Sequence, residues 1–192
     1  MGCYTCSTIE DQEYKKLITT IRNGYIDREG VKHRPNIQIA TILVLEANLG
    51  CRIGDIMSLE TDSIVWDGGV WKLDIIEEKT GKHRSFIVPQ KVKDFIDNYA
   101  ISREIVHGKL FTISAQAVWK CLRQVTRYLE LEKISTHSMR KKCATELYKK
   151  SGFDIELVSS FLNHSSIAVT RTYLRRSSKQ MEEAISQIVD LA

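Results

Sequence analysis

The sequence predicts a mostly helical α+β fold with a small three-stranded antiparallel sheet inserted between helices. Most of the 192-residue chain repeats its apolar residues at helical spacing, whereas residues 63–89 contain three short β-like runs separated by turns. The composition, 43% hydrophobic and 27% charged residues, is that of a soluble globular protein. This length allows one domain with a substantial core.

Two helices are predicted in the first quarter of the chain. Residues 8–23 form an amphipathic helix that starts with a capping box, Ser7-x-x-Glu10. Its inner side holds Ile9, Leu17, Ile18 and Ile21. A polar link, "NGYIDREGVKHRP", follows. Residues 36–49 then form a strongly apolar, buried helix that ends at Gly50.

The predicted sheet consists of "SIVW", "GVWKLDII" and "HRSFIVP", separated by the turns "DGG" and "KTGK". After the sheet the helical pattern returns, and we expect helices at residues 91–98, 115–129, 137–150, 155–162 and 167–174. Residues 177–192 form a last helix with an apolar side made of Met181, Ile185, Ile188 and Val189. That side is suited to packing either on its own core or on a neighbouring subunit.

The cysteines and the hydropathy pattern exclude several classes of protein. Five cysteines are an odd number, which argues against a disulfide framework and is typical of a reducing compartment. Cys3 and Cys6 form a CxxC pair without a second pair at metal-ligand spacing, so we expect no metal site. No run approaches the ~20 apolar residues of a membrane helix, and the N-terminus lacks a signal-peptide pattern. These features predict a cytoplasmic protein.

Basic residues are concentrated in one part of the chain. The segment from Lys133 to Arg176 contains nine Lys or Arg and three Asp or Glu, a local net charge of +6. Because the whole chain carries +4, the remainder is −2. A solvated helix face would give a similar pattern, but the asymmetry also favours a polyanionic partner such as DNA.

Six polar residues have types that together suit phosphate chemistry. They are Arg52, Lys79, His137, Arg140, His164 and Tyr173. Lys79 lies on the turn "KTGK", and His137 and Arg140 are one helical turn apart. His164 follows one predicted helix in "LNH", and Tyr173 ends the next one in "TYLRR".

In this order and spacing the six residues resemble the active-site set of the tyrosine recombinases, also called phage-type integrases. The resemblance covers the chain from about residue 10 onward, and the nine-residue separation of His164 and Tyr173 is usual in that family. A single HxxR pair is common by chance, whereas six matches in order are specific. The resemblance implies a catalytic domain that cuts and rejoins DNA through a 3′-phosphotyrosyl bond, without metal, cofactor or ATP.

Three of the residues are assigned to attack and proton transfer. A phenol with an ordinary pKa of about 10 attacks near neutrality when cations stabilise its phenolate or a base removes its proton. Tyr173, which is close in sequence to several arginines, is therefore the expected nucleophile. By resemblance, Lys79 protonates the leaving 5′-oxygen and His137 assists proton transfer at the tyrosine.

The other three residues are expected to bind the scissile phosphate. Arg52 and Arg140 present guanidinium forks that match two phosphate oxygens, and His164 donates a further hydrogen bond by resemblance. Asp55, where the family often has glutamate, is expected to orient Arg52. Asn163 replaces the family's usual glycine and tolerates the left-handed turn expected there. Further DNA contacts are expected from Lys82, Lys141, Lys142, Arg171 and Arg175.

We interpret residues 1–192 as one catalytic domain, with an N-terminal arm at 1–8 and a C-terminal helix at 177–192 that docks either in trans or on its own core. The N-terminal core-binding domain of most family members is absent, so we expect either a fragment or a naturally short recombinase. The expected partners are double-stranded DNA, further copies of the chain in a DNA-bound tetramer, and accessory DNA-bending proteins.

Three other functions are considered. The stretch "FDIELVSSFLNHSSIAVTRTYLRR" has the length of a helix-turn-helix, but a regulator of that type leaves Arg52, Lys79 and the HxxR pair unexplained. A type IB topoisomerase uses the same residue types and relaxes supercoils as a monomer. A degenerate recombinase would bind DNA without cutting it, and the six filled positions give no sign of such decay.

Overall fold

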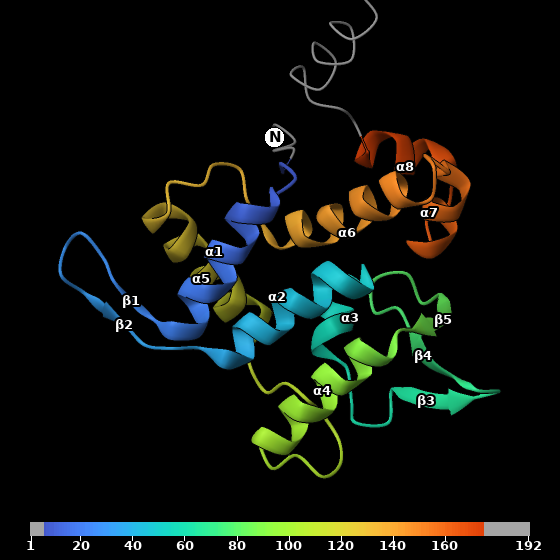
Figure 1. Ribbon diagram of the computed structural model, residues 1–192, viewed down its shortest axis with the longest axis horizontal. Helices are drawn as coiled ribbons and strands as arrows, with labels where there is room; N and C mark the ends of the chain where they lie inside the picture. The colour runs from blue at the N-terminus through green and yellow to red at the C-terminus, as the bar shows by residue number, and fades with distance from the viewer. Residues whose placement is uncertain (1–5, 175–192) are drawn as a thin grey trace, which may run out of the picture.

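The computed structural model describes residues 6–174, which form eight helices and two small antiparallel sheets. Figure 1 shows α2 crossing the middle of the molecule, with α1 and α5 towards one end and the larger sheet at the other. The expected α+β class with one three-stranded antiparallel sheet is confirmed. The predictions for residues 177–192 and for Cys3 concern positions outside the described residues.

Helix α1 spans Asp11–Asn23 and starts three residues later than expected. Its capping box is formed by Glu10 and Glu13, with the backbone N–H of Glu10 donating to Glu13 Oε2 at 3.1 Å. The Ser7 capping box was wrong, because the backbone N–H of Ser7 donates to the carbonyl of Lys133 at 3.0 Å and so holds this segment outside the helix. The apolar side is buried as predicted.

The polar link contains a hairpin that the sequence analysis missed. Strands β1 (Tyr25–Ile26) and β2 (Lys32–His33) pair through a turn in which Asp27 Oδ1 accepts the backbone N–H groups of residues 29 and 31. The ring of Tyr25 lies between those of His33 and Tyr128, with centroid distances of 4.3 and 4.5 Å. Strands of two residues are too short to show an alternating pattern.

Helix α2 (Ile37–Leu49) is the central element of the core. Asn36 caps its start by accepting the N–H of Ile39, and Gly50 ends it in the left-handed conformation with a φ of 57°. The helix packs against α1, α4 and α6. A short helix, α3 (Ile53–Met57), follows directly and begins with Arg52 as its N-cap residue.

The larger sheet has the strand order β3-β4-β5, and both pairs are antiparallel. Ile64, Leu73 and Phe86 lie opposite one another across the three strands and face the core. The turn between β4 and β5 carries Lys79. The strands and the helix that follows are β3 (Ile64–Asp67), β4 (Val70–Ile76), β5 (His83–Val88) and α4 (Gln90–Ser102).

The last four helices place the remaining predicted residues. They are α5 (Ala115–Tyr128), α6 (Thr136–Lys150), α7 (Ile155–Phe161) and α8 (Ile167–Tyr173). Buried residues of α6 and α7 form a second small apolar cluster, against which Tyr173 and Leu174 pack. Figure 1 shows α7 and α8 gathered at one end of α6. Tyr173 therefore packs on the cluster that α6 and α7 form.

Two kinds of feature are not found among residues 6–174. None of the helices there is long and apolar enough to cross a membrane. No group of three or more His, Cys, Asp or Glu side chains in the same range is arranged to hold a metal ion.

The link between α7 and α8 gives a prediction about stability. Asn163 has a φ of 53°, which confirms the left-handed turn expected there. We expect Asn163→Ala to lower the free energy of unfolding by about 1 kcal/mol. A residue with a Cβ is strained in the left-handed conformation, and alanine lacks the side-chain amide that lets asparagine adopt it. Asn163→Gly should lose less, since glycine adopts it freely. Urea denaturation of both variants measures this, and equal losses would contradict it.

Candidate active site

Arg52 is held at two points where the chain leaves α2. Its Nη1 donates to Oε2 of the fully buried Glu77 at 2.7 Å, and its backbone N–H donates to Asp55 Oδ2 at 3.2 Å. Asp55 thus acts on the backbone of Arg52, whereas Glu77, which the sequence analysis did not single out, holds the guanidinium. The arginine side chain remains 19% exposed and is open to a ligand.

Arg140 is almost completely buried, with 2% of its surface exposed. Its Nη1 donates to the carbonyl of Gly50 at 2.8 Å, and its Nη2 donates to the carbonyl of Leu162 at 2.9 Å. These carbonyls lie at the C-terminal ends of α2 and α7. None of the ion pairs formed within residues 6–174 involves Arg140, so its charge is held mainly by backbone dipoles and not by a carboxylate.

A third arginine, Arg84, lies beside the first two and was missed. Its Nη2 donates to the carbonyls of Phe161 at 2.6 Å and Leu49 at 3.2 Å, and its guanidinium lies 4.6 Å from the centre of the Phe86 ring. The alternation of β5 contained the signal, because Arg84 is on the same side of the strand as Phe86 and Val88. A charged residue on the core-facing side of a strand needs partners in the core.

His164 lies against Arg140. Its Nε2 is 3.4 Å from Arg140 Nη2, and its Nδ1 is 2.9 Å from the hydroxyl of Thr170. If the arginine donates to Nε2, the proton of the neutral ring is on Nδ1 and points to the threonine. Burial, and then the charges of Arg140 and Arg52, lower the pKa of His164 to about 4, so the ring is neutral near pH 7.

Tyr173 has its ring edge-on to that of His164, with centroids 5.6 Å apart. Its hydroxyl donates to the backbone carbonyl of His137 at 3.3 Å. The expectation that neighbouring cations favour the phenolate is not met here, because burial raises the pKa of Tyr173 above its ordinary value and Arg140 opposes this only in part. Arg171 is exposed, and residues 175 and 176 lie outside the described range.

His137 and Lys79 lie at the open side of the site. His137 is on the first turn of α6, and the pKa of its ring is lowered by loss of hydration and by the charges of Arg140, Lys79 and Arg52. Hydrogen bonds join residues that are far apart in the sequence: Arg52 and the turn that carries Lys79 share Glu77. Arg140 contacts His164, and Tyr173 bonds to the carbonyl of His137. The six predicted residues therefore come together where α3, the β4–β5 turn, α6, α7 and α8 meet.

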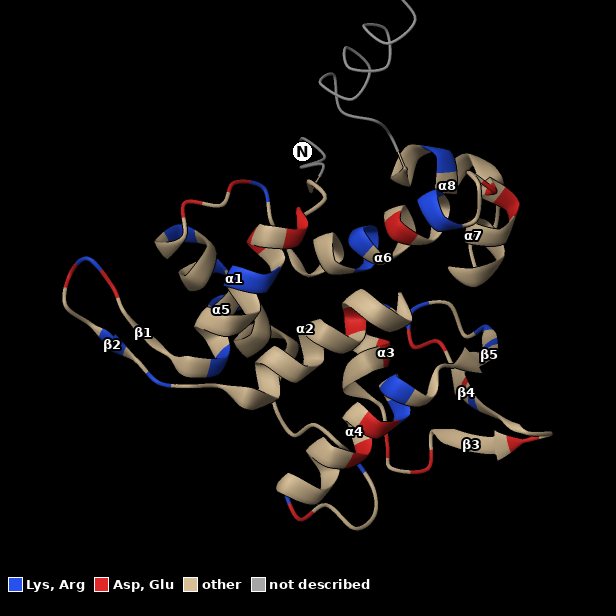
Figure 2. Cartoon of the chain, viewed as in Figure 1, with Lys and Arg blue, Asp and Glu red and all other residues tan. Residues whose placement is uncertain are grey.

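The five basic residues expected at DNA have different surroundings. Lys141 Nζ donates to the carbonyl of Cys6 at 3.3 Å. Lys142 is ion-paired with Asp11, and its Nζ lies 5.4 Å from the centre of the Tyr14 ring. Both lysines thus have partners within the domain. Figure 2 shows basic residues along α6 and α8. The other three are Lys82 and Arg171, which are exposed, and Arg175, which lies outside the described residues.

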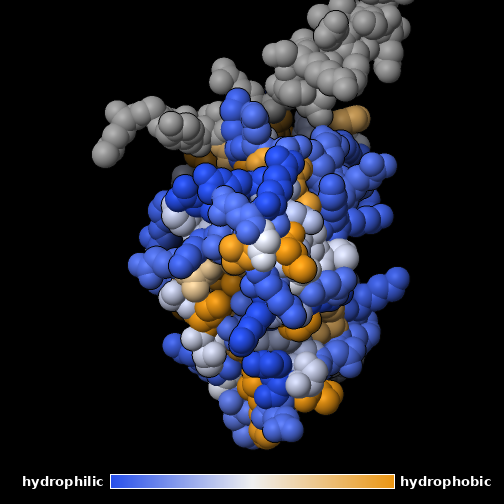
Figure 3. All heavy atoms as spheres, turned by 90° about the vertical axis from the view of Figure 1, so that its left-hand side faces the viewer, coloured by the Kyte–Doolittle hydropathy of each residue, from blue (hydrophilic) through white to orange (hydrophobic). Residues whose placement is uncertain are grey.

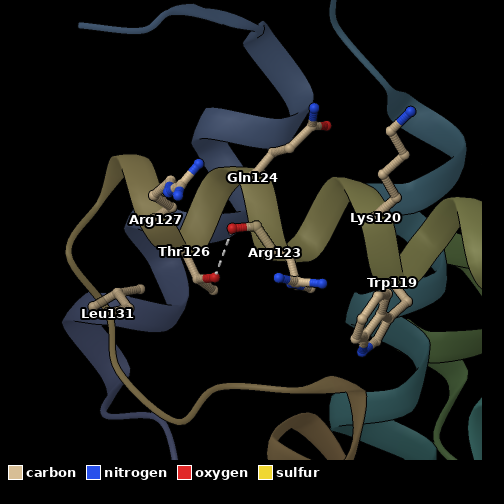
Figure 4. A pocket seen from close by; sticks show the side chains of 7 residues that line it. All are labelled: Trp119, Lys120, Arg123, Gln124, Thr126, Arg127 and Leu131. Carbon is tan, nitrogen blue, oxygen red and sulfur yellow. Dashed lines mark hydrogen bonds between the residues drawn. The ribbon is translucent and has the colours of Figure 1, made fainter.

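Helix α5 carries a basic and aromatic face that the sequence analysis did not assign to any function. A hollow of about 430 Å³ lies along this helix. Figure 4 shows the side chains that line it, among them Trp119, Lys120, Arg123, Gln124 and Arg127. The guanidinium of Arg123 lies 4.6 Å from the centre of the half-exposed Trp119 ring. Figure 3 shows a largely hydrophilic surface at this end of the molecule.

Glu46 is a buried acid directly behind the site. It lies on α2 with no exposed surface, and neither carboxyl oxygen has a hydrogen-bond partner among the described residues. Burial raises the pKa of Glu46 well above its ordinary value, and the charge of Arg140 opposes that rise. The carboxyl therefore loses its proton less readily than an exposed acid, which weakens its ability to neutralise Arg140.

Comparison with known proteins shows the family of this chain. The sequence profile described as "Phage integrase family" matches residues 7–180. The chain belongs to the phage integrase family. This match covers every residue of the predicted active site.

Three relatives of this integrase-family chain show how far the likeness extends. Tyrosine recombinase XerA of Pyrococcus furiosus is 26% identical over 94% of this chain and 61% of its own length, so the chain spans less than two thirds of that relative. The catalytic domain of bacteriophage HP1 integrase shares the fold with a TM-score of 0.64 and 17% identity, over 95% of both chains. XerH recombinase bound to its difH substrate matches with a TM-score of 0.66 and 20% identity, over 93% of this chain and 53% of that one.

The ring of His164 should titrate with a midpoint of about 4 in the free protein. The pKa is lower than usual because burial and nearby cations disfavour the imidazolium. Below the ordinary pKa of about 6.5, His164 binds a proton in the unfolded chain but not in the folded chain. This group therefore lowers stability as the pH falls towards 4. NMR titration of the ring tests this, and a midpoint near 6.5 would contradict it.

Replacing Glu46 tests whether this buried acid is neutral. The folded chain keeps a proton that the unfolded chain releases above pH ~4.3, so Glu46 lowers stability as the pH rises through this range. Compared with wild type, Glu46→Gln should therefore gain stability with rising pH, by at most about 1.4 kcal/mol per pH unit. Urea denaturation of both proteins between pH 4 and 8 measures this. A difference that does not change with pH would show that the acid is not held neutral.

Proposed function

We propose that this chain provides the catalytic centre of a site-specific DNA recombinase that cleaves and rejoins strands through a 3′-phosphotyrosyl intermediate. The observation that carries the proposal is the buried Arg140 guanidinium, which has no carboxylate partner among the described residues and lies beside His164 and Tyr173. A cation held in this way attracts an anion, and a DNA phosphate next to a phenol is the anion that these neighbours suit.

The phosphate would lie among three donors. Arg52 is partly exposed, and Arg140 offers the charge that its backbone partners do not neutralise. His164 is neutral in the free domain, and the negative charge of a bound phosphate favours its protonated form. The imidazolium then donates from Nε2 while Nδ1 keeps its contact with the Thr170 hydroxyl. This arrangement stabilises charge that develops on the non-bridging oxygens.

Cleavage then proceeds with balanced proton transfers. Tyr173 Oη attacks the phosphorus and forms the O–P bond, and its proton passes to the neutral ring of His137. The bond between phosphorus and the 5′-oxygen breaks, and that oxygen takes a proton from the ammonium of Lys79. Because the phosphotyrosyl bond keeps the energy of the broken bond, attack by a 5′-hydroxyl of another strand rejoins DNA without ATP.

The face of α5 extends the proposed DNA contact beyond the catalytic centre. Lys120, Arg123 and Arg127 supply positive charge on one helix, and Trp119 supplies an aromatic surface. Positive charge neutralises the DNA backbone, and polar side chains on a helix are suited to base edges in a groove. Lys82 and Arg171 add exposed charge nearer the active site. We propose these residues as contacts in place of Lys141 and Lys142.

Relatives support double-stranded DNA as the partner, because the XerH structure contains the difH substrate. Exchange between two DNA sites requires four strand cleavages, so we propose that four copies of the active site assemble on DNA. Accessory DNA-bending proteins and docking of residues 177–192 on a neighbouring copy belong to the same proposal. We propose a cytoplasmic location as part of the same hypothesis, because a DNA substrate suits that compartment.

A helix-turn-helix regulator fits the described contacts less well. Helices α7 and α8 do form a helix pair, but Thr170 is buried in α8 and Tyr173 packs on the α6–α7 cluster, so the second helix is only partly free to enter a groove. This function also does not explain why Glu77 holds the guanidinium of Arg52 in a fixed position. A type IB topoisomerase would share the cleavage step and differ in releasing relaxed circles without exchanging strands.

The proposal is tested by trapping the covalent intermediate. A pool of nicked duplexes with a randomised central sequence is incubated with the protein, and adducts that resist denaturation are recovered and sequenced. We expect an adduct in which Tyr173 carries the 3′-phosphate, because the nick lets the released 5′ fragment diffuse away and prevents rejoining. Tyr173→Phe should form no adduct while retaining DNA binding.

Tyr148→Phe is the matched control, because it removes another tyrosine hydroxyl close to the same apolar cluster. It should form the adduct at the wild-type rate. DNA binding without any adduct in the wild-type protein would contradict the proposal and favour a binding protein.

A further inference from the structure

One carboxylate oxygen joins the turn that carries Lys79 to Arg52. Glu77 has no exposed surface, and its Oε2 accepts hydrogen bonds from Arg52 Nη1 at 2.7 Å and from the hydroxyl of Thr80 at 2.7 Å. The two donors belong to different elements, since Arg52 begins α3 and Thr80 lies on the β4–β5 turn. Lys79 immediately precedes this threonine in the chain.

The same turn is fixed at its other end. The backbone N–H of Glu78 donates to Asp55 Oδ1 at 3.0 Å, and Asp55 Oδ2 accepts the backbone N–H of Arg52. Lys79 therefore lies between two links, one on each side, and both links end on Arg52. Within the turn, the N–H of Gly81 donates to the carbonyl of Glu77 at 2.8 Å.

The side chain of Lys79 has no comparable support of its own. It is exposed, and its ammonium forms no ion pair in the part of the chain that the structure describes. A long, flexible side chain is placed by its backbone when it has no partner. The position of the Lys79 ammonium relative to a phosphate on Arg52 thus depends on the two links.

We propose that Thr80 is a positioning residue for Lys79. Its hydroxyl, through Glu77, keeps the lysine turn at a set distance from the arginine that holds the scissile phosphate. This inference rests on the proposed function, in which the Lys79 ammonium gives a proton to the 5′-oxygen as the bond from phosphorus to that oxygen breaks. Proton transfer depends steeply on distance, so a turn that is released from Glu77 loses rate at this step.

Thr80→Val removes the hydroxyl and keeps the shape of the side chain, and it leaves the bond between Glu77 and Arg52 in place. Thr80→Ser keeps the hydroxyl and serves as the matched control. Each protein is tested on a nicked duplex of the sequence that the wild-type chain captures from the randomised pool. A second duplex carries sulfur in place of the 5′-bridging oxygen, and a thiolate with a pKa of about 8.5 leaves without being protonated.

We expect Thr80→Val to slow adduct formation on the oxygen substrate by about tenfold or more, which is part of the usual contribution of general acid catalysis. On the sulfur substrate it should equal the wild-type protein, and Thr80→Ser should be close to wild type on both. A wild-type rate of Thr80→Val on the oxygen substrate would overturn the inference. So would an equal loss on both substrates, because the threonine would then act through Arg52 or the fold.

The two proposals fail in different ways. One outcome is that Lys79→Ala forms the adduct slowly on the oxygen substrate and at the wild-type rate on the sulfur substrate, while Thr80→Val has the wild-type rate on both. The proposed function then stands, and the positioning role of Thr80 is wrong. If the wild-type chain captures no duplex from the randomised pool, the proposed function is wrong, and the inference fails with it.

Discussion

Free carbonyl groups at the C-terminal ends of α2 and α7 hold two buried guanidinium groups, and the rest of the site is arranged around this interaction. Arg140 bonds to the carbonyls of Gly50 and Leu162, and Arg84 bonds to those of Leu49 and Phe161. The last carbonyls of a helix have no partner within it and carry partial negative charge, so they suit a cation. The two arginines thereby join the central helix to the segment that carries His164 and Tyr173.

Holding a cation with dipoles has a different consequence from holding it with a carboxylate. An ion pair would neutralise Arg140 and weaken its attraction for a phosphate, whereas carbonyl groups fix its position and leave its net charge. Burial raises the pKa of Glu46, a buried acid on which the charge of Arg140 acts, and so weakens any neutralisation of that charge. Burial and the charge of Arg140 together keep His164 neutral, whereas burial alone, against that charge, keeps the Tyr173 phenol protonated. In the free site the guanidinium groups are therefore already positioned, and the Tyr173 nucleophile is protonated before an anion binds.

The sequence predicted the architecture well because that part depends on local patterns. Helical spacing, Gly50 as a helix end and turn residues in the sheet are properties of neighbouring residues. The order and types of six residues also identified the family. What the sequence did not reveal depends on contacts across the fold. Glu77 looked like one acid of a charged turn, although it binds an arginine 25 positions away.

The protonation states were beyond sequence reasoning for a similar reason. Several arginines near Tyr173 in sequence suggested a stabilised phenolate, yet the pKa depends on which charges are near in space and on how much water remains. In the structure burial outweighs Arg140, and Arg171 is directed to the surface. Likewise Lys142 contributes to a basic stretch of sequence and is paired with Asp11 in the fold.

The most direct test of this account is a crystal structure of Tyr173→Phe bound to an uncut duplex of the captured sequence. The account predicts that the scissile phosphate contacts Arg52, Arg140 and His164, while Arg140 keeps its bonds to the carbonyls of Gly50 and Leu162. A phosphate located elsewhere, or an Arg140 side chain that leaves both carbonyls to reach it, would contradict the claim that the helix ends preorganise the site.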